Sequence, residues 1–163
     1  MEINGLIYKL PKEIKLLIGT FLIILSIGFY TGLLFVNESS SMSASGIEEN
    51  YLGNENNEDA QIMRFKKPEK EMLSIVHSHV LSMSMIFFLV GLILSITSLS
   101  KPLKLFLMVE PFLSVILTFG GIYLLWKGVL WMRYVVMLSG SLMTITFTSS
   151  VLIILFQLFR SKK

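Results

Sequence analysis

Residues 103–126 read LKLFLMVEPFLSVILTFGGIYLLW, an apolar stretch whose charged residues are Lys104 and Glu110. A helix needs about 20 predominantly apolar residues to cross the hydrocarbon core of a bilayer, so this stretch is long enough to span a membrane. Further apolar stretches of similar length lie at residues 16–36, 73–99 and 132–159. The sequence therefore predicts an all-α polytopic membrane protein, built as a four-transmembrane-helix bundle with one extracytoplasmic loop.

The composition supports a single membrane domain. Of the 163 residues, 53% are hydrophobic and 15% are charged, and the mean hydropathy is +0.72, so the chain cannot present an ordinary soluble surface. The absence of cysteine excludes disulfides, thiolate metal sites and iron–sulfur clusters. The net charge of +3 comes from basic residues in the flanks of the apolar stretches, which predicts no nucleic-acid role.

The stretches divide the chain into a cytoplasmic segment at 1–15, an extracytoplasmic loop at 37–72 and a cytoplasmic tail at 160–163. The first apolar run exceeds the roughly 7–15 residues of a signal-peptide core, which favours an uncleaved helix over a signal peptide. With both termini inside, eight of the fourteen Lys and Arg residues lie in the cytoplasm, as the positive-inside rule favours. Residues 71–79, ahead of a Phe-rich span, resemble small bacterial inner-membrane proteins, which implies a multi-pass protein of that membrane.

The loop has two parts of different composition. Residues 39–59 are rich in Ser, Asn, Glu and Gly, so we expect them to be mobile unless a partner orders them. Pro68 followed by Glu69 and Glu71 is a good helix opening, so the second spanning helix should begin there. The basic segment 64–67 between them is a solvated linker, a docking segment for an extracytoplasmic partner, or a segment that lies on the membrane surface with Phe65 inserted.

The connections at 100–102 and 127–131 are short, so the second, third and fourth spanning helices should be antiparallel neighbours. In the first spanning stretch, Gly28 and Gly32 have the Gly-x-x-x-Gly spacing that lets helix backbones approach closely. We expect this pair to pack inside the bundle or to form a homo-oligomer. The bilayer and another membrane or extracytoplasmic protein are the remaining predicted partners.

His77 and His79, the two histidines of the chain, are the first candidate site. Residues two apart on a helix point about 200° from each other, so these imidazoles cannot share one ion on an unbroken helix. His79 shares a face with Met72 and Met83, a combination that suits copper or haem iron. Because the second spanning helix is expected to begin at Pro68, two or more turns before the hydrocarbon, both histidines should lie near the outer surface. The second ligand of a haem there could be Met137, among belt aromatics such as Tyr123, Trp126, Trp131 and Tyr134.

Glu110, the one acid within the four apolar stretches, is the second candidate site. It precedes Pro111, which removes the hydrogen bond to the carbonyl of residue 107. A carboxylate near the inner boundary is costly unless it is protonated, paired or hydrated. We expect it either to reach the cytoplasmic face and pair with a basic residue, or to form a proton or cation site. The basic residues in reach are Lys101, Lys104 and Arg160.

Four function hypotheses follow from these features. The first, which we prefer, is a non-enzymatic subunit or assembly scaffold of a membrane complex. The second is a redox protein binding b-type haem or quinol through His79, His77 and a methionine such as Met83 or Met137. The third is copper or other metal handling through His77, His79, Met72 and Met83. The fourth is proton-coupled transport through Glu110, for which four helices offer little room.

Overall fold

The computed structural model describes residues 4–55, 57 and 62–160. The ends of the predicted terminal segments, 1–3 and 161–163, and part of the predicted mobile segment, 56 and 58–59, lie outside the described residues. Within the described chain the structure is helical, and four helices are long and apolar enough to cross a membrane. They are α1 (Lys12–Ser40), α3 (Glu69–Ser95), the continuous helix formed by α4 (Lys101–Val115), η2 (Ile116–Gly120) and α5 (Gly121–Trp126), and α6 (Met132–Phe159).

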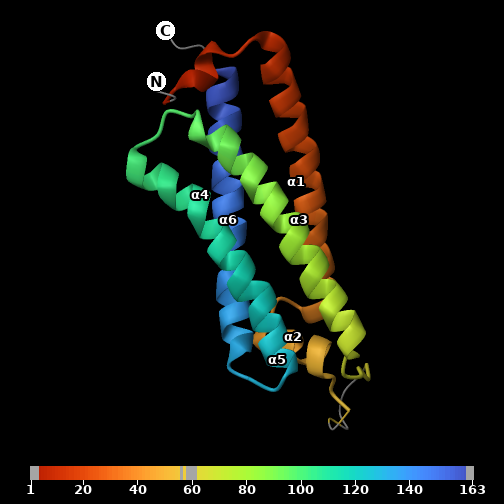
Figure 1. The fold of residues 1–163 in the computed structure, drawn as a ribbon. Coiled ribbons are helices and arrows are strands. Elements are labelled where there is room, and N and C mark those ends of the chain that lie inside the picture. Colours follow the sequence, from red (N-terminus) through yellow and green to blue (C-terminus); the bar gives the residue numbers. More distant parts are fainter. Residues whose placement is uncertain (1–3, 56, 58–61, 161–163) are drawn as a thin grey trace.

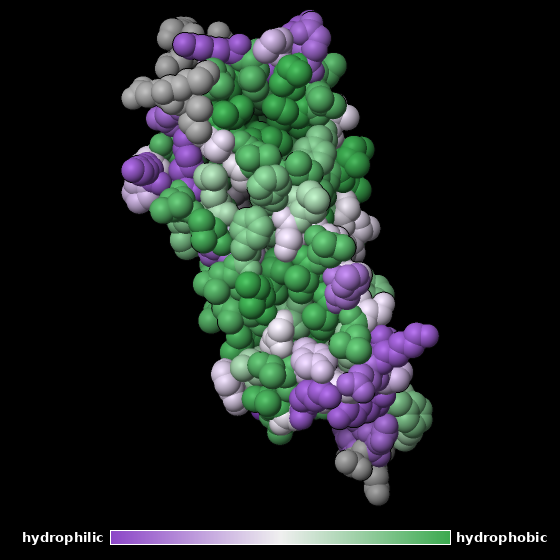
Figure 2. Space-filling view, viewed as in Figure 1, coloured by the Kyte–Doolittle hydropathy of each residue, from purple (hydrophilic) through white to green (hydrophobic). Residues whose placement is uncertain are grey.

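The four spanning helices lie side by side along one long axis (Figure 1). The second, third and fourth are antiparallel neighbours, as the short connections predict. Both chain termini lie at one end of the bundle, called here the termini end (Figure 1). Hydrophobic residues cover the middle of the molecule and hydrophilic residues gather at its two ends (Figure 2). This distribution is that of a multi-pass membrane protein.

Helix α3 begins where its sequence predicts, with Pro68 before the first turn and Glu69 and Glu71 within that turn. It continues through Ser78 without a break, so the two histidines keep separate directions. The helix ends at Ser95, four residues before the end of the apolar stretch. The reason is tertiary: the amides of Gly5 and Ile7, from the segment that holds η1 (Leu6–Lys9), bond to carbonyls in the turn after α3.

The same turn is held from two other helices. Lys104 Nζ of α4 donates to the carbonyls of Ser95 at 2.9 Å and Thr97 at 2.6 Å, a favourable place for a cation because helix carbonyls are unpaired there. Gln157 of α6 accepts from the Ser98 amide at 2.7 Å and donates to the Ser98 carbonyl at 3.1 Å. The termini end is therefore closed by specific polar contacts.

At the opposite end, the segment that the sequence predicts to be mobile contains a helix, α2 (Ala44–Leu52). Ser43 caps its amino end by accepting a hydrogen bond from the Gly46 amide at 3.0 Å. Ile47 is buried and Tyr51 packs against the core. The expectation of mobility is therefore corrected for the described part of the segment, because these two side chains supply apolar anchors that the polar composition hides.

Residues 53–68 join α2 to α3, and we call α2 together with the described residues of this connection the cap. The backbone of Asn54 and Arg64 pairs at 2.9 Å, and the Asn54 side chain accepts from the Arg64 amide at 2.7 Å. The Arg64 guanidinium donates to the Ser39 carbonyl at the end of α1. These bonds make the basic segment part of the folded structure rather than a linker.

Helix α1 is the most loosely packed spanning helix. Only 17% of its most apolar window is buried, against 50% for the helix α4–η2–α5 and 44% for α6. Its main anchors are Leu22, which is fully buried, and Phe29, which stacks on Phe147 of α6 with ring centroids 4.0 Å apart. Most of the α1 surface therefore faces outward.

Candidate functional site: a buried carboxyl in a polar seam

Glu110 lies on α4 directly before Pro111 and is only 7% exposed. Its Oε1 accepts a hydrogen bond from the hydroxyl of Ser114, one turn farther along the helix. Its Oε2 is buried without a hydrogen-bond partner. Because buried polar atoms are nearly always paired, an orphaned carboxyl oxygen inside a membrane helix marks a candidate functional site.

A second buried hydroxyl follows one turn after Ser114. Thr118 lies in the π-helical segment η2 and shares a 2.7 Å hydrogen bond with Ser139 of α6. Single π-helical turns inside α-helices are often found at functional sites. We call Glu110, Ser114, Thr118 and Ser139 the polar seam, and all four are less than 8% exposed.

The register of α6 against the seam follows from two contacts. Thr118 meets Ser139, and a Cβ added at Gly121 would lie 2.9 Å from Val136 Cγ2. Gly121 is thus required for the close approach of α5 and α6. Since the helices are antiparallel, Glu110 lies about level with Thr146. The Thr146 hydroxyl donates to carbonyls of its own helix at 3.0 and 3.1 Å.

The sequence-based expectation that Glu110 reaches the cytoplasmic face is wrong. The side chain is buried and bonds to Ser114, which lies on the side away from Lys104. Lys104 binds the carbonyls after α3 and the Asn4 side chain instead. None of the three ion pairs among the described residues involves Glu110.

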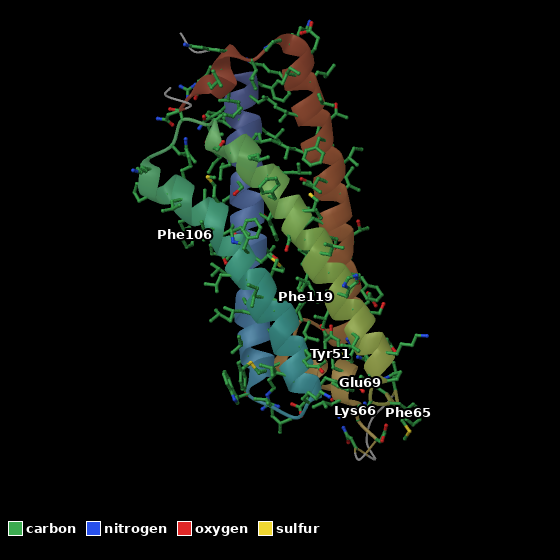
Figure 3. The ribbon with its side chains drawn as sticks, in the orientation of Figure 1. Tyr51, Phe65, Lys66, Glu69, Phe106 and Phe119 are labelled. Atoms are coloured by element: carbon green, nitrogen blue, oxygen red, sulfur yellow. The ribbon has the colours of Figure 1, made fainter. Side chains whose placement is uncertain are left out.

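His79 lies on the surface of α3, and its ring stacks on Phe119 of η2 with centroids 4.9 Å apart. Phe119 is labelled in the lower part of the helix α4–η2–α5 in Figure 3, toward the end that holds α5. His79 is therefore about two turns inward of Trp126, deeper than the sequence predicts. Its Nδ1 lies 2.8 Å from the Ile75 carbonyl. A carbonyl only accepts, so Nδ1 carries the proton and Nε2 is the free nitrogen.

The other predicted ligands lie in different surroundings. His77 is exposed, Met72 is fully buried, Met83 is partly buried against the core and Met137 is 39% exposed. Within the part of the chain that the structure describes, no group of three or more His, Asp or Glu side chains is placed to hold a metal ion. Met72 in particular lies in the core, away from the exposed faces of both histidines.

Trp126 is not the belt residue that the sequence suggests. It is 8% exposed, and its Nε1 donates to the Lys67 carbonyl of the cap at 2.7 Å. The ammonium groups of Lys66 and Lys127 lie 5.1 and 4.7 Å from the centroid of its ring. Trp131 and Tyr134, by contrast, are 60% and 53% exposed, as belt residues are.

Other contacts tie the cap to the bundle. Arg133 of α6 pairs with Glu48 of α2, and Lys127 lies 3.4 Å from Glu69 at the start of α3. Lys66 and Glu69 lie together at this end, close to the cap residues Tyr51 and Phe65 (Figure 3). The cap is thus a folded surface with charged residues at its edge.

The glycine pair of α1 is not used inside the chain. Gly28 and Gly32 are exposed, and a Cβ added to either would meet no atom within 4 Å. On another side of α1, an open groove of about 580 Å³ runs along α6. Tyr30 and Thr148 share a 2.7 Å hydrogen bond across it.

Sequence reasoning identified Glu110 but missed its partners. Ser114 and Thr118 follow it at four-residue spacing, which places all three on one helix face. That spacing was visible in the sequence. The pairing with Ser139 and the π-helical turn were not, because both depend on how α6 packs.

The comparisons with known proteins give one result for family membership. A family model described as a transmembrane helical domain, Aq_1264_TM, matches residues 41–163. The match begins just after α1, so it covers the cap, α3, the helix α4–η2–α5, which we call the seam helix, and α6. No curated protein and no solved structure matches the sequence. On the strength of that match, this multi-pass membrane chain belongs to the Aq_1264_TM family of transmembrane helical domains.

Proposed function

We propose that the protein is a non-enzymatic subunit of a membrane complex and that it associates with a second copy of itself through α1. The observation that carries this proposal is the exposed pair Gly28 and Gly32, beside which an added Cβ meets no atom within 4 Å. Small residues four apart let two helix backbones come close enough for tight packing in lipid.

A second copy is the favoured occupant because the surface is self-complementary. In a twofold dimer each α1 presents the same glycine pair to the other, as an isologous interface requires. Helix α1 carries no charged residue between Lys15 and Glu38 that would select a different partner by charge. It also lies outside the matched family domain, which fits an element added for assembly.

The test measures self-association of the purified protein in liposomes. Energy transfer between labelled copies reports the association as the lipid-to-protein ratio is varied. We expect Gly28→Leu and Gly32→Leu to weaken association about tenfold or more, because a lost packing energy of about 1.4 kcal/mol has that effect. Gly140→Leu is the matched control, since Gly140 of α6 also has no atom within 4 Å of an added Cβ.

A wild-type chain that stays monomeric at every lipid ratio would overturn the proposed association. The same conclusion follows if the α1 variants associate as strongly as the wild type.

The orientation that we propose, with both termini in the cytoplasm of a bacterial cell and the cap outside, rests on the lysine and arginine distribution.

A redox role is the second candidate, and the His79 geometry favours it. The Nδ1 bond to Ile75 and the stack on Phe119 hold the imidazole with Nε2 free, the arrangement that a haem or quinol ligand needs. A reduced-minus-oxidised spectrum of the purified protein tests it. Haem bands that vanish in His79→Ala and persist in His77→Ala would support this role. Elemental analysis for copper tests the metal alternative in the same sample.

A further inference from the structure

The charge state of Glu110 follows from what surrounds it. The side chain is 7% exposed, and no cation among the described residues pairs with it. Lys104, the basic residue one and a half turns away on the same helix, is bound to three oxygens at the termini end. An unpaired buried carboxylate costs about several kcal/mol even after relaxation. Glu110 therefore lies in the interior of the bundle without a neighbouring cation to offset a negative charge.

The hydrogen bonds assign the proton to one oxygen. Oε1 accepts from the Ser114 hydroxyl, so it acts as the carbonyl oxygen of the acid. Oε2 is buried and has no hydrogen-bond partner among the described residues, so it is the carboxyl oxygen that remains available to hold a proton. A buried O–H group at this oxygen would need an acceptor.

Pro111 supplies an acceptor nearby. Proline has no N–H, so the carbonyl of Leu107 loses the donor that an α-helix normally provides. Leu107 lies three residues before Glu110 and is only 6% exposed, and residues three apart share a helix face. A single water between Oε2 and the Leu107 carbonyl would satisfy both groups.

The polar seam places further hydroxyl groups in line with Glu110. Ser114 and Thr118 repeat the four-residue step from Glu110, with a rise of about 6 Å per step, and Thr118 continues to Ser139 on α6. A titratable group of α3, His79, packs against the same helix at Phe119, nine residues beyond Glu110. Helix α6 has no titratable residue between Tyr134 and Arg160, and α1 contributes Tyr30, which bonds Thr148.

We propose that Glu110 is an intramembrane proton-binding site, with the proton on Oε2, and that it exchanges this proton with water that enters along the polar seam. The site goes beyond the proposed assembly role, since it uses neither α1 nor the cap. Its ligand is a proton rather than a metal cation, because the carboxyl is the single acid within the seam.

Infrared spectroscopy of the full chain in liposomes tests the proposal. We expect the wild-type spectrum minus that of Glu110→Gln to contain the carbonyl stretch of one neutral carboxylic acid. The band should shift in deuterated water, which shows exchange with solvent. Ser114→Ala should move it to higher frequency, since Oε1 then loses its hydrogen bond. Ser141→Ala is the matched control, because the Ser141 hydroxyl is exposed and bonds within its own helix, and it should leave the band unchanged.

A difference spectrum with only carboxylate bands would overturn the proposal, and so would an acid band that never shifts in deuterated water. Loss of the acid band on adding sodium would assign the site to a metal cation instead.

Dicyclohexylcarbodiimide supplies a measurement on the wild type, in case the variant does not fold. The protonated acid adds across a C=N bond of this apolar reagent without a leaving group, and we expect the peptide that holds Glu110 to carry the adduct. An unmodified Glu110 would contradict the proposal.

Discussion

At the scale of single residues, Trp126 shows how one side chain joins two parts of the molecule. Its indole N–H reaches the Lys67 carbonyl of the cap, and the ammonium groups of Lys66 and Lys127 both lie over its ring. A sequence pattern identifies tryptophan as a belt residue because most membrane tryptophans lie at the interface. Here the cap covers it, so its role is structural.

Trp126→Phe should loosen the cap by about 1–2 kcal/mol, because phenylalanine loses the hydrogen bond and has a weaker interaction with cations. Trypsin cleavage after Arg64 and Lys66 measures this opening, and we expect faster cleavage in the variant. Trp131→Phe is the control, since Trp131 is 60% exposed. Equal cleavage rates in the two variants would contradict the role of Trp126.

Tyr51 predicts a pH dependence. Burial raises the pKa of its phenol above the ordinary 10.0, and a hydrogen bond from the Asn50 side chain partly opposes this shift. Because the folded pKa exceeds the unfolded one, the neutral phenol stabilises the cap below about pH 10, and this stability is lost as the pH rises through the folded pKa.

A titration of phenolate absorbance in the wild type and in Tyr51→Phe measures the effect. The difference between the two curves should have its midpoint above 10.0. A midpoint at or below that value would show that Tyr51 is not buried in the folded cap.

At the scale of elements, α2 depends on a tight turn after α1. A Cβ at Gly46 would lie 1.9 Å from the Ser40 carbonyl oxygen, a backbone atom that cannot move aside without shifting the end of α1. The turn also contains Ser41 and Met42 with φ of 51° and 46°, values that are uncommon for residues other than glycine. The connection is therefore specific to this packing.

Gly46→Ala should displace α2 from the bundle. An alanine in place of glycine normally stabilises a helix by roughly 1 kcal/mol, and we expect the clash with Ser40 to destabilise the folded state by more than this gain. Hydrogen exchange of the α2 amides would report the change as lost protection. Gly140→Ala, which meets no atom within 4 Å, should leave α2 protected. If Gly46→Ala keeps α2 as protected as in the wild type, the close contact with Ser40 is not needed.

The seam helix combines three backbone features in one span. Pro111 removes a hydrogen bond, η2 widens the helix over Ile116–Gly120, and Gly121 admits α6 closely. Proline and π-helical turns are both known causes of helix kinks. Together they place Thr118 against Ser139 and leave Glu110 in the interior.

At the scale of the whole molecule, both termini lie at one end and the cap at the other (Figure 1). The excess of Lys and Arg at the termini end predicts that this end faces the cytoplasm. Alkaline phosphatase fused after residue 50 should be active, and the same enzyme fused after residue 163 should be inactive. The reverse pattern would invert the orientation and place the cap in the cytoplasm.

Several features of the molecule were determined by the sequence alone. The number of spanning helices follows from the length of the apolar runs, and the antiparallel order of the last three spans follows from the short connections. The start of α3 follows from a proline with two acids after it. These are local properties, because a membrane helix satisfies its own backbone hydrogen bonds and is recognised without its neighbours.

Only the tertiary structure decided which polar groups meet. The burial of Glu110, the Thr118–Ser139 bond, the docked helix α2 and the covered Trp126 all depend on the register between helices distant in sequence. Hydropathy indicates that a residue is in a span, but lipid and protein interior are equally apolar, so it does not distinguish a residue facing one from a residue facing the other. For that physical reason the sequence located the carboxyl, while the packing of α6 against α4 determined its surroundings.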